Sequence, residues 1–124
     1  MTTSMTDAAA KNAQTIQAFA DGQNNIDRSA IAAFLTEDAT FFPGARGASF
    51  EGREAFLDAL LGWLNNHENG RFEILSEIYT DDEAFNEWRF VAKTKDGADV
   101  DTHGVDYFKL RDGKILVKSS FRKV

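Results

Sequence analysis

The sequence predicts an α+β fold, in which antiparallel strands pack on helices, and three observations support this class. The first half of the chain places apolar residues at helical spacing, whereas the second half alternates apolar and polar residues as a half-buried strand does. Two Asp-Gly pairs, at 96–97 and 112–113, separate strand-like segments and are strong hairpin signals. Helices followed by hairpin-linked strands are typical of α+β layer folds.

Two helices are predicted at the start of the chain. The first begins at Thr6 or Asp7, because either side chain can accept a hydrogen bond from a main-chain N–H of the first turn. Its apolar face runs to about Ala20, and the polar stretch 22–25 ends it. Asp27 then caps a short second helix.

A brief strand, a loop and a third helix follow. The strand covers 39–42, and a glycine-rich loop covers 44–52. The third helix, at 53–66, has a wide apolar stripe, which implies burial against a sheet. The remaining predicted strands cover 71–79, 83–95, 98–110 and 114–123.

Length and composition limit the classes of protein. The 124 residues suit a single domain, which we place at 7–124, after a flexible N-terminus at 1–6. A net charge of −6 opposes binding to nucleic acid. No apolar run is long enough to span a bilayer, and the polar N-terminus lacks the order of a signal peptide, so we expect no membrane partner and a cytoplasmic location.

The sequence does not suggest a metal site or a cofactor. There is no cysteine, the two histidines are far apart, and no calcium-binding loop is present. We interpret His67 as a group that binds the C-terminal end of the third helix, where an imidazolium is favourable. We place His103 on the outer face of the sheet, as an interface residue.

The first hairpin supports a register argument. A two-residue turn at 96–97 places Glu87 directly opposite Asp106, with Cβ atoms about 5 Å apart. Two carboxylates this close repel, so one holds its proton to a higher pH and can act as a general acid. Arg89 is diagonal to Asp106 and could instead neutralise it. The alternative is a solvated cluster of charges.

The second hairpin allows two registers. A two-residue turn at 112–113 pairs Asp106 with Ser119, whereas a three-residue turn with a left-handed Gly113 pairs Asp106 with Lys118. We prefer the three-residue turn because it places apolar side chains on one face of the sheet and mainly polar and charged side chains on the other. One face then carries Trp88, Phe90, Val105, Tyr107, Val117 and Phe121. The other carries Glu87, Arg89, Asp106, Phe108, Lys118, Ser120 and Arg122.

Two interpretations of this sorting remain open. In a half-buried sheet the apolar face is the core and the charged face meets water. In a strongly curved sheet the charged face lines a concave pocket, and the apolar face is buried against a second subunit. Periodicity does not choose between them.

Four motifs stand out along the chain: AAFLTEDATF (32–41), EGREAF (51–56), NEWRF (86–90) and GVDYFKLRDGKI (104–115). Together they resemble the SnoaL-like polyketide cyclase and ketosteroid isomerase group of the nuclear transport factor 2-like superfamily. The resemblance covers roughly residues 9–124. It implies a cone of curved antiparallel sheet closed by three helices, as in cystatin-like folds, and dimerisation through the outer sheet face.

The resemblance also implies a role for Asp106, which matches the aspartate that donates an oxyanion-hole hydrogen bond in ketosteroid isomerases. The other catalytic residues of ketosteroid isomerases have no counterpart in this chain. The isomerase base falls near 42–43 (Phe-Pro), and its tyrosine falls around 16–19, where this chain has none. We therefore do not expect steroid isomerisation by that mechanism.

Together these arguments predict a small-molecule enzyme of the isomerase, cyclase or hydratase type, with Asp106 and Glu87 as its catalytic pair. The expected ligand is anionic or carbonyl-bearing. The expected substrate-binding residues are Arg89, Lys118, Ser120, Arg122, Phe108 and Trp63. The rival hypothesis is a non-catalytic binding or dimerisation module of the same fold. Either way, we expect a homodimer.

Overall fold

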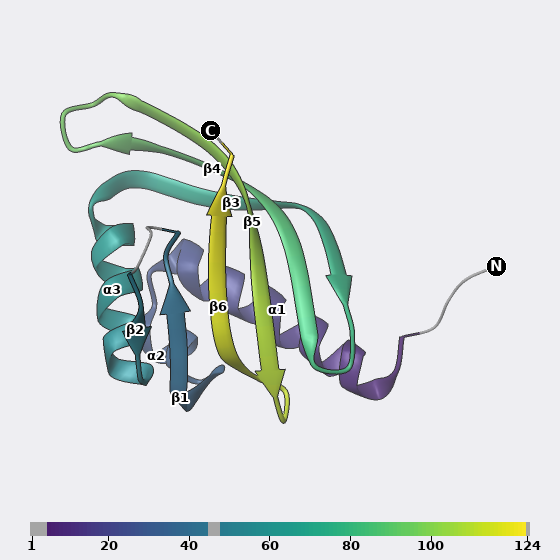
Figure 1. The fold of residues 1–124 in the computed structure, drawn as a ribbon. Helices are drawn as coiled ribbons and strands as arrows, with labels where there is room; N and C mark the ends of the chain where they lie inside the picture. Colours follow the sequence, from purple (N-terminus) through teal and green to yellow (C-terminus); the bar gives the residue numbers. More distant parts are fainter. Residues whose placement is uncertain (1–4, 45–47, 124) are drawn as a thin grey trace.

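The computed structural model describes residues 5–44 and 48–123, and within them it contains three helices and one six-stranded sheet (Figure 1). The helices are α1 (Asp7–Asn25), α2 (Arg28–Ala32) and α3 (Arg53–Asn65). The strands are β1 (Leu35–Phe42), β2 (Phe50–Glu51), β3 (His67–Tyr79), β4 (Glu83–Thr94), β5 (Asp99–Arg111) and β6 (Lys114–Arg122). The predicted flexible N-terminus lies largely outside the described residues, as does part of the 44–52 loop.

The predicted class is confirmed, but the element order has one addition, since β2 forms within the predicted 44–52 loop, and one strand pair of the sheet is parallel. Its strand order is β2-β1-β6-β5-β4-β3, and β1 runs parallel to β6 while all other neighbours are antiparallel. The long strands bend over the helices, so that α1 and α3 lie on one side of a curved, unclosed sheet (Figure 1). We call that side the inner face and the opposite side the outer face.

The helix starts follow from the predicted caps. Thr6 Oγ1 accepts a hydrogen bond of 3.1 Å from the Ala9 N–H, and Asp27 Oδ1 accepts one of 3.1 Å from the Ala30 N–H. The predicted end of α1 is wrong, because the helix continues to Asn25. Gly22 is a packing residue instead: a Cβ there would lie 2.8 Å from Ile31 Cγ1, so glycine permits α2 to approach α1 closely.

The core lies between the helices and the inner face. Its buried apolar residues come from all three helices and from four strands, as Ile16, Phe19, Ile31, Leu35, Ala39, Phe41, Phe56, Leu57, Leu60, Leu61, Leu64, Ala84, Phe108, Leu110 and Ile115. In the part of the chain that the structure describes, no helix is long and apolar enough to cross a membrane.

The register predicted for the first hairpin is wrong by one residue. Asp106 pairs with Asn86, and Glu87 pairs with Val105. The cause is a longer connection: the last strand pair is Lys93 with Asp99, and the Thr94 N–H then bonds the Ala98 carbonyl. Because side chains alternate between faces, this slip of one residue moves every β4 side chain to the face of the sheet opposite to the predicted one.

The second hairpin adopts a register that differs from both of those allowed by the sequence, because Asp106 pairs with neither Ser119 nor Lys118. Its turn has two residues, Asp112 and Gly113, with φ of 53° and 75°, as a type I′ turn requires. The predicted three-residue turn is therefore wrong. However, a register shift after Lys109 adds one residue to β6, so Asp106 pairs with Ser120. This restores the predicted sorting on β5 and β6: Asp106, Phe108, Lys118, Ser120 and Arg122 share the inner face.

Candidate functional site

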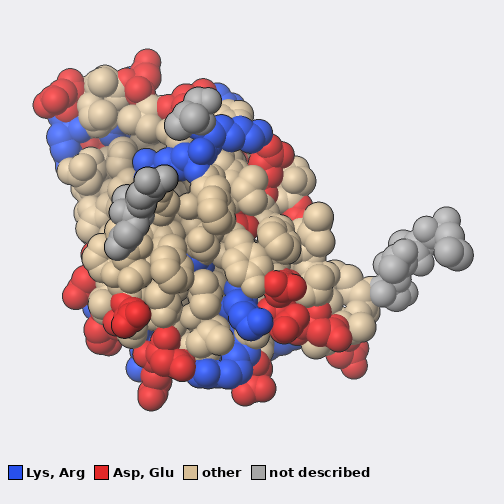
Figure 2. Space-filling model, in the orientation of Figure 1, with Lys and Arg blue, Asp and Glu red and all other residues tan. Residues whose placement is uncertain are grey.

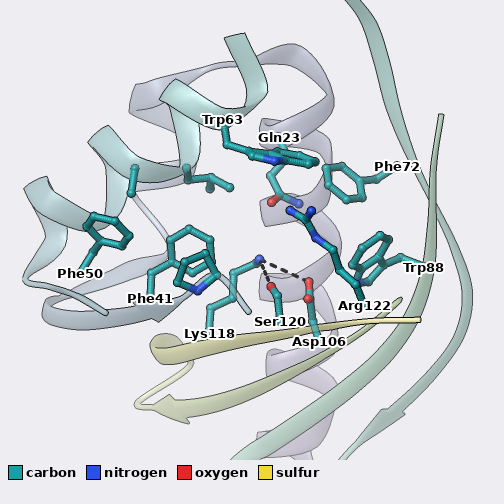
Figure 3. Close-up of a pocket in the computed structure, with 13 residues that line it drawn as sticks. Gln23, Phe41, Phe50, Trp63, Phe72, Trp88, Asp106, Lys118, Ser120 and Arg122 are labelled. Atoms are coloured by element: carbon teal, nitrogen blue, oxygen red, sulfur yellow. Dashed lines mark hydrogen bonds and ion pairs between the residues drawn. The ribbon is translucent and has the colours of Figure 1, made fainter. Parts of the chain in front are cut away.

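A cavity of about 250 Å³ lies between the inner face, α1 and α3 (Figure 3). Its walls are mainly apolar, with five aromatic side chains, and all its polar residues except one come from β5 and β6. The cavity is lined by Gln23, Phe41, Pro43, Phe50, Ala59, Leu60, Trp63, Phe72, Trp88, Asp106, Lys118, Ser120 and Arg122. An apolar space with a few converging polar groups is the usual form of a small-molecule site.

The polar side of the cavity centres on Lys118. Its Nζ lies 3.5 Å from Asp106 Oδ2 and donates a hydrogen bond of 2.8 Å to Ser120 Oγ. The same nitrogen lies 4.6 Å from the centre of the Phe41 ring. The side chains of Lys118 and Asp106 are only 5% and 7% exposed. Water therefore screens this pair far less than a surface pair.

The surroundings of Lys118 also change its protonation. Burial lowers the pKa of the Lys118 amine below its ordinary value, and the nearby Arg122 charge lowers it further. The Asp106 carboxylate opposes both effects without cancelling them. A larger fraction of this amine is therefore neutral near pH 7 than for an ordinary lysine.

Several buried polar atoms that line the cavity make no hydrogen bond with a described residue. They are Asp106 Oδ1, Gln23 Oε1 and Trp88 Nε1. Leaving such a group unpaired costs about 1–3 kcal/mol, so a bound molecule that pairs with it gains affinity. Asp106 thus has one oxygen directed to Lys118 and another available to a ligand or to a proton.

Arg122 adds a second cation at the cavity. Its guanidinium lies 5.3 Å from the centre of the Trp63 ring, within the range of a cation–π contact. Arg122 forms no ion pair with a carboxylate in the described part of the chain. Figure 3 shows its side chain reaching between Trp88 and the pair formed by Lys118 and Asp106.

Glu87 and Arg89 do not belong to this site, which corrects the sequence prediction. Both lie on the outer face, where Glu87 accepts a bond of 2.7 Å from Lys123, and Arg89 binds both carboxylate oxygens of Asp101. The Lys123 ammonium lowers the pKa of Glu87, whereas the predicted carboxylate pair would have raised one pKa. The coupled pair of Glu87 and Asp106 does not exist in this structure.

The other predicted residues divide into two groups. Lys118, Ser120, Arg122 and Trp63 line the cavity with Asp106. Phe108 does not line it: its side chain is fully buried and packs edge-on against Phe19 with ring centres 6.0 Å apart.

Sequence reasoning missed several residues of the cavity wall. Gln23 was assigned to the end of α1, and Trp88 was placed on the opposite face because of the register error. Phe41, Phe50 and Phe72 carried no signal beyond their apolar character, because aromatic residues in a core and in a pocket have the same sequence pattern.

The histidines and acidic residues offer no metal site in the described residues, where no three metal-binding side chains cluster. His67 binds the last turn of α3, as predicted, through a 2.9 Å contact of Nδ1 with the Trp63 carbonyl. His103 lies on the outer face, 3.7 Å from Asp101.

Solved structures share this fold at low identity. A candidate SnoaL-like polyketide cyclase from Jannaschia sp. CCS1 matches with a TM-score of 0.90 and 15% identity, over 98% of this chain and 92% of that chain. SalBIII, an epoxide hydrolase/cyclase-like enzyme with a role in pyran ring formation in the polyether salinomycin, matches with a TM-score of 0.82 and 19% identity, over 93% and 92%.

A third similar structure is a protein from Catenulispora acidiphila with a ketosteroid isomerase-like fold, in complex with trimethylamine. It matches with a TM-score of 0.79 and 17% identity, over 87% of this chain and 84% of that chain. Similarities at these identities show a shared fold. None of the curated proteins matches the chain.

The family assignment comes from the sequence itself. The model of the SnoaL-like domain matches residues 16–117, which include α2, α3, the strands β1 to β5, and parts of α1 and β6. With the curved sheet, the three helices and the neighbours above, this match shows that the chain belongs to the SnoaL-like domain family.

Proposed function

We propose that this protein is an enzyme that performs acid–base chemistry on a small, largely apolar molecule with a carbonyl group, of the isomerase, cyclase or hydratase type. One observation carries the proposal: a carboxylate and an amine, both nearly fully buried, meet on one side of an aromatic cavity. A charged pair in such a place costs desolvation energy, so a purely structural role is poorly served by it.

Asp106 is the proton-transferring group in this proposal. Its Oδ1 takes a proton from the carbon beside the substrate carbonyl, and the bonding electrons pass to the carbonyl oxygen. Lys118 donates a hydrogen bond to that oxygen and stabilises the enolate charge in surroundings that water barely screens. Return of the proton to another carbon gives an isomer, and attack of the enolate carbon on an electrophile of the same molecule gives a ring.

The remaining residues of the cavity bind and orient the substrate. Trp63 and Phe72 contact each other at a ring separation of 6.0 Å and supply apolar surface for the body of the substrate. Ser120 holds the Lys118 amine in place through its hydrogen bond. Arg122 is available to a carboxylate or a second oxygen of the substrate.

The family membership agrees with this class of chemistry, because two of its structural neighbours are a candidate polyketide cyclase and an epoxide hydrolase/cyclase-like enzyme. Steroid isomerisation by the ketosteroid isomerase mechanism is not proposed. Pro43 stands in the cavity wall near the position of that base and cannot take a proton.

Proton exchange tests the proposal without knowledge of the natural substrate. The protein is incubated in D₂O with a panel of small ketones, such as cyclohexanone and acetophenone, and the loss of each α-proton signal is followed by NMR. We expect exchange above the buffer rate for at least one ketone, and loss of that excess in Asp106→Asn. Asp99→Asn, which alters an exposed outer carboxylate bound to Lys93, is the matched control.

The rival hypothesis, a non-catalytic binding module, gives a different result in the same experiment. A ketone would then shift the NMR signals of residues that line the cavity, yet its α-protons would exchange no faster than in buffer. Equal exchange by the wild-type protein and Asp106→Asn would also overturn the assigned role of Asp106.

We further propose that the protein forms a homodimer through the outer face. That face carries exposed apolar side chains, namely Phe42, Ile78, Phe85, Val91 and Phe121. Figure 2 shows a broad uncharged area in the middle of one side of the molecule, bordered by acidic and basic side chains. Sedimentation should show a dimer that Phe85→Asp dissociates, and a wild-type monomer at micromolar concentration would contradict the proposal.

A further inference from the structure

Lys118 differs from every other lysine in the chain. The sequence has seven lysines, and six of them are exposed, whereas Lys118 is buried with its amine on the wall of the cavity. We propose that the Lys118 amine is a covalent site, which condenses with the carbonyl group of an aldehyde or ketone bound in the cavity to form an imine.

The position of the amine suits a nucleophile. Figure 3 shows the tip of Lys118 meeting Ser120 and Asp106 on one side of the cavity, with Trp63 and Gln23 on the opposite side. A carbonyl compound between these walls would present its carbon to Nζ. Only a small molecule fits beside the amine, because the cavity offers about 250 Å³.

The surroundings also favour the reactive form of the amine. A lysine attacks a carbonyl only as the neutral amine, and burial in an apolar pocket is one of the ways in which proteins make a lysine nucleophilic. The lowered pKa of Lys118 is consistent with this, since burial and the Arg122 charge both disfavour its protonation. The Phe41 ring, 4.6 Å from Nζ, covers one side of the amine with apolar surface.

Asp106 completes the proton transfers that the condensation needs. Its carboxylate lies 3.5 Å from Nζ and can accept the proton that the amine loses. The nitrogen then attacks the carbonyl carbon to give a carbinolamine, Asp106 returns the proton to the hydroxyl group, and water leaves as the C=N bond forms. One amine and one carbonyl group give one imine and one water, with no oxidant or reductant involved.

This inference deepens the proposed function, because it rests on the same cavity admitting a carbonyl compound. It changes the role of Lys118 from a hydrogen-bond donor to a covalent partner. An imine is also a better electron acceptor than a ketone once it is protonated, so the same Asp106 would remove the neighbouring proton more readily.

Reductive trapping tests the inference on the intact protein. Benzaldehyde, which is small, aromatic and free of α-protons, is added near pH 7 with sodium cyanoborohydride, which reduces an imine to a stable secondary amine. Peptide mapping by mass spectrometry then gives the labelling rate of each lysine. We expect Lys118 to be labelled at least severalfold faster than the exposed Lys114 and Lys123.

Two controls connect fast labelling to the site. Benzyl alcohol, which has the same ring without the carbonyl group, should slow the labelling of Lys118 and leave Lys114 unaffected. Asp106→Asn should slow the labelling of Lys118 alone, because losing the group that transfers the protons outweighs the larger neutral fraction of the amine in this variant. Because Lys114 is exposed in the folded protein and in the unfolded chain alike, its labelling does not report folding, and circular dichroism of the variant shows whether it remains folded.

Labelling of Lys118 no faster than that of the exposed lysines in the wild-type protein would overturn the inference, whether the cause is poor access or an unreactive amine. The proposed function fails separately, through absence of α-proton exchange. Exchange without trapping at Lys118 leaves Asp106 as the base and removes only the covalent step.

Discussion

The two faces of the sheet carry ion pairs of the same chemical kind in opposite surroundings. On the outer face Arg89 lies 2.8 Å from Asp101, with the two side chains 43% and 50% exposed. On the inner face Lys118 lies 3.5 Å from Asp106, with side chains 5% and 7% exposed. The outer pair is shorter, but water screens it, and exposed pairs add little to stability.

The burial of an ion pair, rather than the distance between its charges, therefore decides how strongly the two charges interact. Two charges removed from water depend on each other, because each loses its solvation and has only the other to replace it. The inner pair costs desolvation energy and is the one to which we assign a chemical role, whereas the outer pairs are solvated and replaceable.

The largest expected effect is on stability when the inner pair is broken. Lys118→Met leaves Asp106 buried without a counter-charge, and we expect it to lower the free energy of unfolding by about 3–5 kcal/mol. The matched outer change, Lys123→Met, removes the exposed partner of Glu87 and should have no measurable effect. Urea denaturation of both variants measures the difference.

Replacing both members of the inner pair sharpens the same point. Asp106→Leu with Lys118→Met removes both charges and fills the space with apolar groups, so the double variant should recover most of the lost stability. A double variant as unstable as Lys118→Met alone would mean that the unpaired charge of Asp106 does not cause the lowered free energy of unfolding.

The next effect concerns the close packing of the inner face. Gly104 lies opposite Trp88, and a Cβ at Gly104 would come within 2.4 Å of the Trp88 ring and 2.5 Å of the Phe121 carbonyl oxygen. Because the second contact is with backbone, Gly104→Ala should lower the free energy of unfolding by about 1–3 kcal/mol.

Gly62 provides the control for that change. It lies in α3, and a Cβ there meets nothing within 4 Å. Gly62→Ala should therefore raise the free energy of unfolding, by up to about 1 kcal/mol, through helix propensity. Destabilisation of equal size in both variants would contradict the packing difference.

A smaller effect is expected in the titration of Lys118. In the protein labelled with ¹³C at lysine Cε, the Lys118 signal should titrate at a lower pH than an ordinary lysine. Arg122→Gln should raise the pKa of Lys118, because a repelling charge is removed, and Asp106→Asn should lower it, because an attracting charge is removed. An opposite response in either variant would contradict the assigned causes.

This titration has a definite consequence for stability. The unfolded chain holds the Lys118 proton to a higher pH than the folded protein does, so unfolding takes up a proton between the two pKa values. The destabilising contribution of this lysine is therefore fully present below the folded pKa and disappears as the pH rises to the unfolded value.

The smallest effect is predicted for Glu87. Glu87→Gln changes a partly exposed outer carboxylate, so neither the exchange of ketone α-protons nor the urea midpoint should change measurably. A loss of exchange comparable to that of Asp106→Asn would mean that the outer face takes part in the chemistry.

The fold was largely predictable because its signals are local. The side chains of Thr6 and Asp27 cap their helices by accepting hydrogen bonds from main-chain N–H groups three residues later. The Asp112-Gly113 turn needs only the positive φ values of its own two residues. The end of α1 was not predictable in this way, since Gly22 serves the contact with Ile31, a residue in another helix.

The candidate site was predictable only in part, because it depends on register. The alternation on β5 and β6 placed Asp106 and Lys118 on one face, and the structure confirms this. A single extra residue in the connection between β4 and β5 moved Glu87 outward and Trp88 inward. No local pattern distinguishes these two registers; the packing of Trp88 against Gly104 and Phe72 does.

The most direct test of the proposed chemistry is a crystal structure of the protein with the ketone that exchanges its α-protons fastest. We expect the ketone in the inner cavity beside Trp63, with its α-carbon facing Asp106. Its oxygen should lie within hydrogen-bond distance of Lys118 Nζ, or its carbon should be bonded to that nitrogen. A ketone bound on the outer face, or in the cavity with its carbonyl directed away from Lys118 and Asp106, would contradict the proposed chemistry.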